Sequence, residues 1–242
     1  MNHFSIKIRF CKNLSTVNSM SLIVNKLKNW DDRQGLKPRN GFIPILPNKN
    51  HRYFQLSPMI LGPVNTGETD FPMAYNLENY WQGSKVFKQD LEPDETIGEK
   101  YKQSKRKMYL DKTPHRHKYK RGMRPICTIF YDGTIEKRYQ YIEARKFYCN
   151  HYTFLAKQQK QYQTILEMLK SGKNLEILGY DGSYLDSRSR SLEDDIKFHY
   201  NDDKEPFGHE KVLFTMLCKD LGLIKSYPWP DLEVESFYPN KI

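Results

Sequence analysis

The stretch "NLENYWQGSKVF", residues 76–87, sets three polar side chains in an otherwise aromatic and apolar run. Successive residues of an α-helix turn by about 100°, so positions i, i+4 and i+7 fall within about 60° of one another. Glu78, Gln82 and Lys85 therefore share one narrow stripe if the segment is helical. A surface helix usually has a broad polar face, and this segment has the reverse. The stripe is either a thin solvent-facing seam or the wall of a polar cavity.

The composition is that of a folded, basic protein. The chain has 242 residues, of which 38% are hydrophobic and 14% aromatic, enough to build a core. No run approaches the roughly 20 apolar residues that a membrane-spanning helix needs, so we expect no membrane partner. The net charge of +10 favours phosphate-bearing partners, although many basic proteins carry such a charge only for solubility.

The cysteines indicate a reducing compartment. They are far apart and show no C-x-x-C spacing, which argues against a zinc site and a disulfide framework: Cys11, Cys127, Cys149 and Cys218. We therefore expect an intracellular protein of the cytoplasm or nucleus, with no metal or other cofactor. Residues 1–30 contain basic residues and no acid, as an organelle-import presequence does. A bias toward Lys, Asn and Tyr over the whole chain is a plainer explanation.

The hydrophobic pattern predicts both helices and short strands, which we take as a mostly helical single domain with a small sheet. We divide the chain into a basic N-terminal extension, residues 1–50, and a folded domain, residues 51–242. Strands are predicted at 3–10, at 174–182 and at a hairpin turning on Asp132 and Gly133, and residues 21–30 are either a strand or a helical turn. Helices are predicted from 76 to before Pro93, within 100–113, across 141–172 as two helices of which the second ends with a cap at Gly172, and across 206–222 with a cap at Gly222. Residues 183–205 read as a mobile loop.

One segment accounts for the positive charge. Residues 100–124 contain eleven Lys or Arg and a single acid, Asp111, so their net charge equals that of the whole chain, +10. The segment is either a solvated basic loop or an electrostatic funnel for phosphates, which would include nucleic acid. Arg116 is the best candidate there for a bidentate phosphate contact.

Two further loci suit a small ligand. Gly208 and His209 begin a predicted helix, where backbone N–H groups and the helix dipole favour an anion. Many helices begin with glycine for purely structural reasons, however. Asp181 follows a buried strand, where it is either a functional carboxylate or the capping residue of a turn.

The motifs that are present favour one chemistry. No Ser-His-Asp arrangement, Walker loop or dinucleotide fingerprint occurs, and the pair His115 and His117 lacks further ligands at metal-binding spacing. A carboxylate beside an amide, an ammonium and aromatic rings suits cleavage of an N-glycosidic bond. That reaction passes through an oxocarbenium-like state, which a carboxylate stabilises while aromatics stack on the base and cations hold phosphates.

The stretch at residues 76–87 resembles a segment of a known protein family. Glu78, Tyr80, Gln82 and Lys85 match the pattern E-x-Y-x-Q-x-x-K of the NADAR family. Leu56 and Ser57 in "LSPMILGPV", the strand "ILGYDG" and the helix "FGHEKVLFTMLC" are similar to further family segments, so the resemblance covers about residues 53–222. It implies an α+β N-glycosidase that removes ADP-ribose from nucleobases or processes phosphoribosylamine intermediates.

The resemblance also implies roles for individual residues. Glu78 is expected to be the catalytic carboxylate, with Gln82, Lys85 and Asp181 as supports. The substrate-binding residues are expected to be Tyr80, Trp81, Gln82, Arg116, Gly208 and His209. The expected substrate carries an ADP-ribosyl or phosphoribosyl group on a guanine-like base.

Two rival functions stay open. The chain is a non-catalytic nucleic-acid-binding or structural protein if it keeps the fold without the chemistry, using residues 100–124. It is a sensor if it binds ADP-ribose without cleaving it.

Overall fold

The computed structural model describes residues 21–27, 40–48, 51–116, 123–132, 135–180 and 190–238. The chain forms two compact units, each made of two segments. Unit 1 comprises Met1–Ser57 and Ala156–Pro228, and unit 2 comprises Pro58–Leu155 and Trp229–Ile242. The sequence predicts one folded domain that begins near residue 51, whereas the compact units are interleaved along the chain. The predicted strand at residues 3–10 lies outside the described residues.

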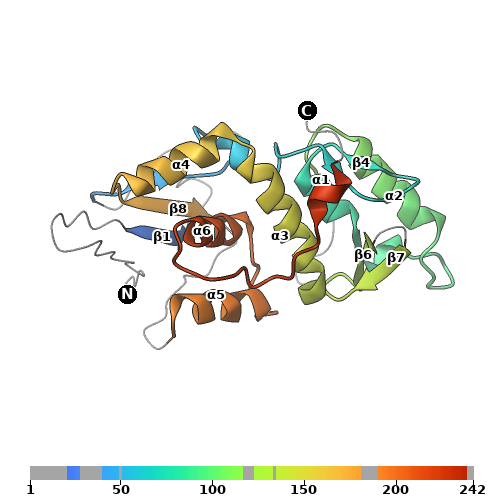
Figure 1. Ribbon diagram of the computed structural model, residues 1–242. Coiled ribbons are helices and arrows are strands. Elements are labelled where there is room, and N and C mark those ends of the chain that lie inside the picture. Colours follow the sequence, from blue (N-terminus) through green and yellow to red (C-terminus); the bar gives the residue numbers. More distant parts are fainter. Residues whose placement is uncertain are drawn as a thin grey trace. The chain divides into compact units, whose positions relative to one another are not determined.

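Unit 1 contains a parallel sheet of three strands in the order β1-β8-β2, of which β1 and β8 are seen side by side in Figure 1. Strand β1 (Leu22–Lys26) and strand β2 (Ile43–Ile45) both pair with β8 (Leu175–Gly179). Every residue of β8 is buried, as the sequence predicts, and a central strand of a parallel sheet is buried because both its faces are covered. Both edge strands therefore lie within the segment predicted as an N-terminal extension, residues 1–50, and β1 confirms the strand alternative for residues 21–30.

The helices of unit 1 follow the periodicity of their apolar residues. They are η2 (Phe54–Leu56), α4 (Lys160–Lys170), α5 (Leu192–Asn201) and α6 (His209–Asp220). Helix α6 contacts β1 and β8, and four of its apolar residues are fully buried: Val212, Leu213, Met216 and Leu217. Gly172 and Gly222 have φ angles of +85° and +74°, which confirms the predicted left-handed caps of α4 and α6.

Unit 2 contains two antiparallel sheets. A short pair is formed by β3 (Val64–Asn65) and β4 (Met73–Ala74). The larger sheet has the order β5-β6-β7, from β5 (Lys85–Val86), β6 (Cys127–Asp132) and β7 (Ile135–Tyr139). The pairing of β6 with β7 across residues 132 and 135 confirms the predicted hairpin.

The helices of unit 2 cover the two sheets. They are α1 (Leu77–Gly83), η3 (Lys88–Asp90), α2 (Glu99–Leu110), η4 (Val234–Phe237) and most of α3 (Tyr141–Lys157), whose end belongs to unit 1. Helix α1 contacts α2, β4 and β5. Within the described part of the chain, no helix combines the length and the apolar character that a membrane span requires.

Two predicted element boundaries are wrong. The helix predicted to run from residue 76 almost to Pro93 ends at Gly83, because Lys85 and Val86 pair with β6 instead. The predicted mobile loop at 183–205 contains helix α5 from Leu192, whose buried Ile196 and Tyr200 lie one turn apart and anchor it. The coarse prediction of a mixed α and β protein with small sheets is confirmed.

Candidate active site on helix α1

The segment before α1 fixes the start of this helix. The N–H groups of Leu77 and Glu78 donate to the carbonyls of Leu61 (2.8 Å) and Pro58 (2.9 Å). Asn76 is the N-cap, and its side chain accepts from the Asn79 N–H at 2.8 Å. These bonds satisfy N–H groups that a helix terminus leaves without partners. The direction of the first turn, and of the Glu78 side chain on it, is thereby set by the chain from residue 58 onward.

The predicted polar stripe forms a hydrogen-bonded chain. The Gln82 amide donates from Nε2 to Glu78 Oε1 at 3.1 Å, and the Lys85 ammonium donates from Nζ to Gln82 Oε1 at 3.2 Å. All three side chains are buried, with at most 8% of each residue exposed. Lys85 reaches the stripe from strand β5, because the helix has ended before it. We call these three side chains the relay.

Aromatic rings lie beside the relay. The Lys85 ammonium lies 4.8 Å from the centre of the Trp81 ring. Trp81 is half-buried, and its ring stacks with Phe130 and lies 5.3 Å and 6.4 Å from the rings of Tyr148 and Tyr141. A cation over an aromatic face is held electrostatically, and broad rings offer stacking surface for a base. The site therefore combines a carboxylate, an amide, an ammonium and flat apolar surface.

Arg116 is brought to Glu78 by a loop that Asn79 holds. The Asn79 side chain donates to the carbonyls of Asp111 (2.8 Å) and Thr113 (2.9 Å) and accepts from the His115 N–H (2.7 Å). Arg116 Nε then lies 3.7 Å from Glu78 Oε1, with 62% of its side chain exposed. An ion pair with so exposed a cation is weak, so the guanidinium is available to a ligand.

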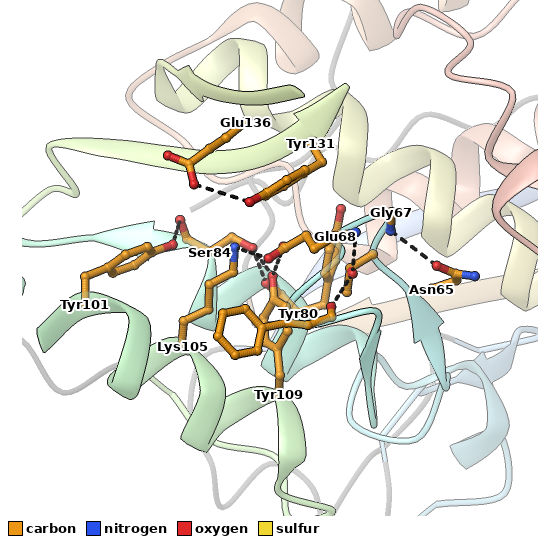
Figure 2. A network of polar contacts seen from close by, with 12 residues as sticks. Asn65, Gly67, Glu68, Tyr80, Ser84, Tyr101, Lys105, Tyr109, Tyr131 and Glu136 are labelled. Atoms are coloured by element: carbon orange, nitrogen blue, oxygen red, sulfur yellow. Dashed lines mark hydrogen bonds and ion pairs between the residues drawn. The ribbon is translucent and has the colours of Figure 1, made fainter. Parts of the chain in front are cut away.

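Unit 2 also contains an enclosed ion pair between Lys105 and Glu68, shown in Figure 2. Lys105 Nζ of α2 lies 2.7 Å from Glu68 Oε2, and both side chains are at most 3% exposed. The ammonium lies within 6 Å of the ring centres of Tyr101, Tyr109 and Tyr131. Tyr109 also donates its hydroxyl hydrogen to Glu68 Oε1 at 3.2 Å.

Burial shifts the pKa of both charged partners. Loss of water raises the pKa of the Glu68 carboxyl, an effect that the Lys105 charge only partly offsets. Loss of water likewise lowers the pKa of Lys105, and Glu68 only partly opposes this shift. Burial also raises the pKa of the Tyr109 phenol well above its usual range. The folded protein thus holds two charges where neither is well solvated.

A second locus from the sequence lies in unit 1, at the carboxyl end of β8. Glu210 Oε1 accepts from the Tyr180 N–H at 3.1 Å, and Gly179 makes room, since a Cβ there would lie 1.8 Å from that oxygen. His209 donates from Nε2 to the Pro47 carbonyl at 3.1 Å. Glu210 puts negative charge into the first turn of α6, which disfavours a second anion at the same amides. The assignment of Gly208 and His209 to substrate stays a prediction.

A hollow in unit 1 lies beside the first turn of α5. Its wall includes Glu193, Ile196, Lys197 and Tyr227. The Glu193 carboxylate accepts from the Lys225 N–H at 3.1 Å and from Ser226, so it holds the opposite wall in place. None of the predicted site residues that the structure describes lines this hollow.

The structure brings together most of the predicted site residues that lie in unit 2. Glu78, Trp81, Gln82, Lys85 and Arg116 form one cluster. Tyr80 lies instead in the core, 1% exposed, against the rings of Tyr109, Phe130 and His151. Gly208 and His209 lie in the other unit, and Asp181 lies outside the described residues.

Sequence reasoning missed the residues that support the cluster. Asn79 is buried and polar beside the stripe, and Glu68 and Lys105 pair across a long stretch of chain. A signal was present for α2: Tyr101, Lys105 and Tyr109 recur at i, i+4 and i+8, which places the lysine on the apolar face. In the described ranges, no three His, Cys, Asp or Glu side chains are grouped so that they could hold a metal ion.

Comparisons of the chain with protein-family models, with curated proteins and with solved structures found no match.

Proposed function

We propose that the protein is a metal-independent N-glycosidase that releases ADP-ribose or phosphoribose from a guanine-like base. One observation carries the proposal: the buried carboxylate of Glu78 is tied through Gln82 to Lys85, beside the ring of Trp81. The resemblance of the same residues to the NADAR pattern supports it.

The roles follow from the chemistry of the bond. Hydrolysis breaks the bond between sugar C1′ and the base nitrogen, joins a water oxygen to C1′, and leaves a proton on the base. Positive charge develops on the sugar in the transition state. Glu78 stabilises that charge and takes the proton from the attacking water. Gln82 and Lys85 orient the carboxylate, because a donor bond to Oε1 fixes the rotation of the group.

The neighbouring groups fit the rest of such a substrate. The half-buried Trp81 offers aromatic surface against which a purine can stack. Arg116 has a planar guanidinium that matches two phosphate oxygens, and its pair with Glu78 is exposed enough to exchange for a phosphate. A pyrophosphate or phosphate bound there would leave the sugar close to Glu78.

The test is a cleavage assay on a panel of substrates. ADP-ribosylated guanine in DNA, ADP-ribosylated guanosine and a phosphoribosylamine are each incubated with the protein, and free ADP-ribose or ribose phosphate is measured by chromatography. We expect release from at least one substrate, and a loss of at least about 100-fold in the Glu78→Gln variant. Equal turnover by Glu78→Gln on the cleaved substrate would rule out the role of Glu78.

A second function is favoured by the outer face of α2. Its buried residues Tyr101, Lys105 and Tyr109 leave the opposite face to exposed Lys102, Arg106 and Lys107. A solvated row of cations suits the phosphates of nucleic acid, with no part for Glu78.

Salt and charge reversal separate the two functions. Binding through α2 weakens steeply with salt, since each neutralised phosphate releases a counterion. In a double variant, Lys102→Glu and Arg106→Glu, the binding function predicts lost affinity for duplex DNA and no dependence on Glu78. The glycosidase function predicts that this double variant releases ADP-ribose from a small nucleoside substrate at an unchanged rate. Calorimetric binding of ADP-ribose by a protein that cleaves nothing would indicate the sensor.

A further inference from the structure

Ser84 connects the enclosed ion pair to the relay. It follows the last residue of α1 and precedes Lys85, and it is fully buried. Its hydroxyl donates to the Tyr80 carbonyl at 2.7 Å and lies 2.7 Å from the Tyr109 hydroxyl. Its own carbonyl accepts from the Tyr101 hydroxyl at 3.1 Å and from the Ile129 N–H at 2.8 Å. Side chains of α2 therefore hold both the side chain and the backbone of Ser84 (Figure 2).

The position of Ser84 decides where Lys85 points. The chain changes there from helix to strand, and Lys85 must reach back to Gln82 Oε1 across this junction. A small rotation about the backbone of Ser84 swings the long lysine side chain by several ångströms at its tip. The 3.2 Å contact within the relay thus depends on how firmly Ser84 is held.

The ion pair in turn holds Tyr109. Glu68 accepts from the Tyr109 hydroxyl, and Lys105 fixes Glu68 through the 2.7 Å contact. Two hydroxyl hydrogens, those of Tyr109 and Ser84, serve three contacts, so Tyr109 donates to Glu68 while the Ser84 hydrogen is shared between the Tyr80 carbonyl and the Tyr109 oxygen. Apolar side chains of the same volume would fill this space at no desolvation cost. What the charged pair adds is a fixed direction for the Tyr109 hydroxyl.

We propose that Tyr109, oriented by Glu68 and Lys105, is a positioning residue that holds Ser84 and thereby keeps Lys85 and Gln82 aligned on Glu78. This inference deepens the proposed function and rests on it. Tyr109 touches neither substrate nor reacting atoms, so it acts only through the relay.

A single hydroxyl deletion tests the inference against a matched control. Tyr109→Phe removes the hydroxyl between Glu68 and Ser84. Tyr131→Phe removes a hydroxyl from another ring beside Lys105, which contacts Glu136 at 3.5 Å and not α1. The readouts are the side-chain amide signal of Gln82 in a ¹⁵N-correlated NMR spectrum, assigned by its loss in Gln82→Met, and kcat and KM for the cleaved substrate.

We expect Tyr109→Phe to shift the Gln82 amide signal and to lower kcat about tenfold with KM within about twofold, since the substrate contacts are kept. Tyr131→Phe should leave the signal and kcat unchanged. Ser84→Ala, which keeps the bond between Tyr109 and Glu68, should reproduce the effect of Tyr109→Phe and serves if that variant does not fold. An unchanged Gln82 signal and kcat in Tyr109→Phe or Ser84→Ala would overturn the inference. If the wild type cleaves nothing, the proposed function fails, and the amide signal alone still decides whether Tyr109 aligns the relay.

Discussion

Replacing Lys105 with Met keeps most of the side-chain volume and removes the ammonium that faces Glu68 at 2.7 Å. Glu68 is then a buried carboxylate with no cation beside it. Breaking such a pair on one side costs about 3–5 kcal/mol, because the remaining charge stays desolvated. For a chain of 242 residues this corresponds to a fall in Tm of about 6–20 °C at neutral pH.

The cost should depend on pH in a definite direction. Burial already raises the pKa of Glu68 above its usual value, and removing Lys105 raises it further. The folded state then holds a proton that the unfolded state releases, so stability falls as pH rises from the unfolded pKa through the folded one. Lowering the pH from 8 to 5 protonates Glu68 and should return up to about 1.4 kcal/mol per pH unit inside that window.

Thermal unfolding followed by circular dichroism at several pH values measures this effect. The double variant Glu68→Gln and Lys105→Met removes both charges and should recover much of the stability that Lys105→Met loses. Two results would refute the reasoning: a deficit in Lys105→Met that is the same at pH 5 and pH 8, or a double variant whose loss is the sum of the two single losses.

Three further predictions concern the support of the site. Gly62→Ala should destabilise unit 2 by at least about 2 kcal/mol, because the new Cβ would lie 2.3 Å from the Tyr75 carbonyl oxygen, and a wild-type urea midpoint would contradict this. Asn79→Ala should release residues 111–116, seen as faster amide exchange in that loop, whereas unaltered protection would show that Asn79 does not hold it. His151 is fully buried and its pKa is lowered by burial to about 3, so below pH 6.5 the unfolded state takes up the proton first and stability falls. His151→Gln should flatten this acid limb of the stability curve by about 1.4 kcal/mol per pH unit, and an equally steep limb would place the titration elsewhere.

Local sequence patterns were sufficient to predict those elements whose decisive interactions are local. Helices α3, α4 and α6 have long apolar periodicity, and the turn at residues 132–135 carries its own Asp-Gly signal. The end of α1 could not be read in this way. Val86 and Phe87 are compatible with a helix, and only pairing with β6 makes β5 a strand.

Distant pairing explains the other differences. The strands β1 and β2 pair with β8, which lies far along the chain, so the sequence leaves residues 21–30 open between a strand and a helical turn and predicts no strand at residues 43–45. Helix α5 is hidden by its polar composition, although Ser191 caps it by accepting from the Asp194 N–H.

The same distinction between local and distant interactions applies to the residues of the candidate site. The contact between Glu78 and Gln82 was predictable because they are one helical turn apart, whereas Lys85, predicted on the same helix, reaches Gln82 from strand β5. The ion pair of Glu68 with Lys105 was not predictable, because neither residue carries a local motif and their contact depends on how β3, β4 and α2 pack.

The single-turnover rate of Glu78→Gln at saturating ADP-ribosylated guanine tests the central claim most directly. The comparison is with wild type and with Glu99→Gln, which removes an exposed carboxylate that forms an ion pair with Lys102 at 3.2 Å. The account predicts that Glu78→Gln still binds the substrate but releases ADP-ribose at least about 100-fold more slowly, while Glu99→Gln matches the wild type. Release by Glu78→Gln at the wild-type rate would contradict it.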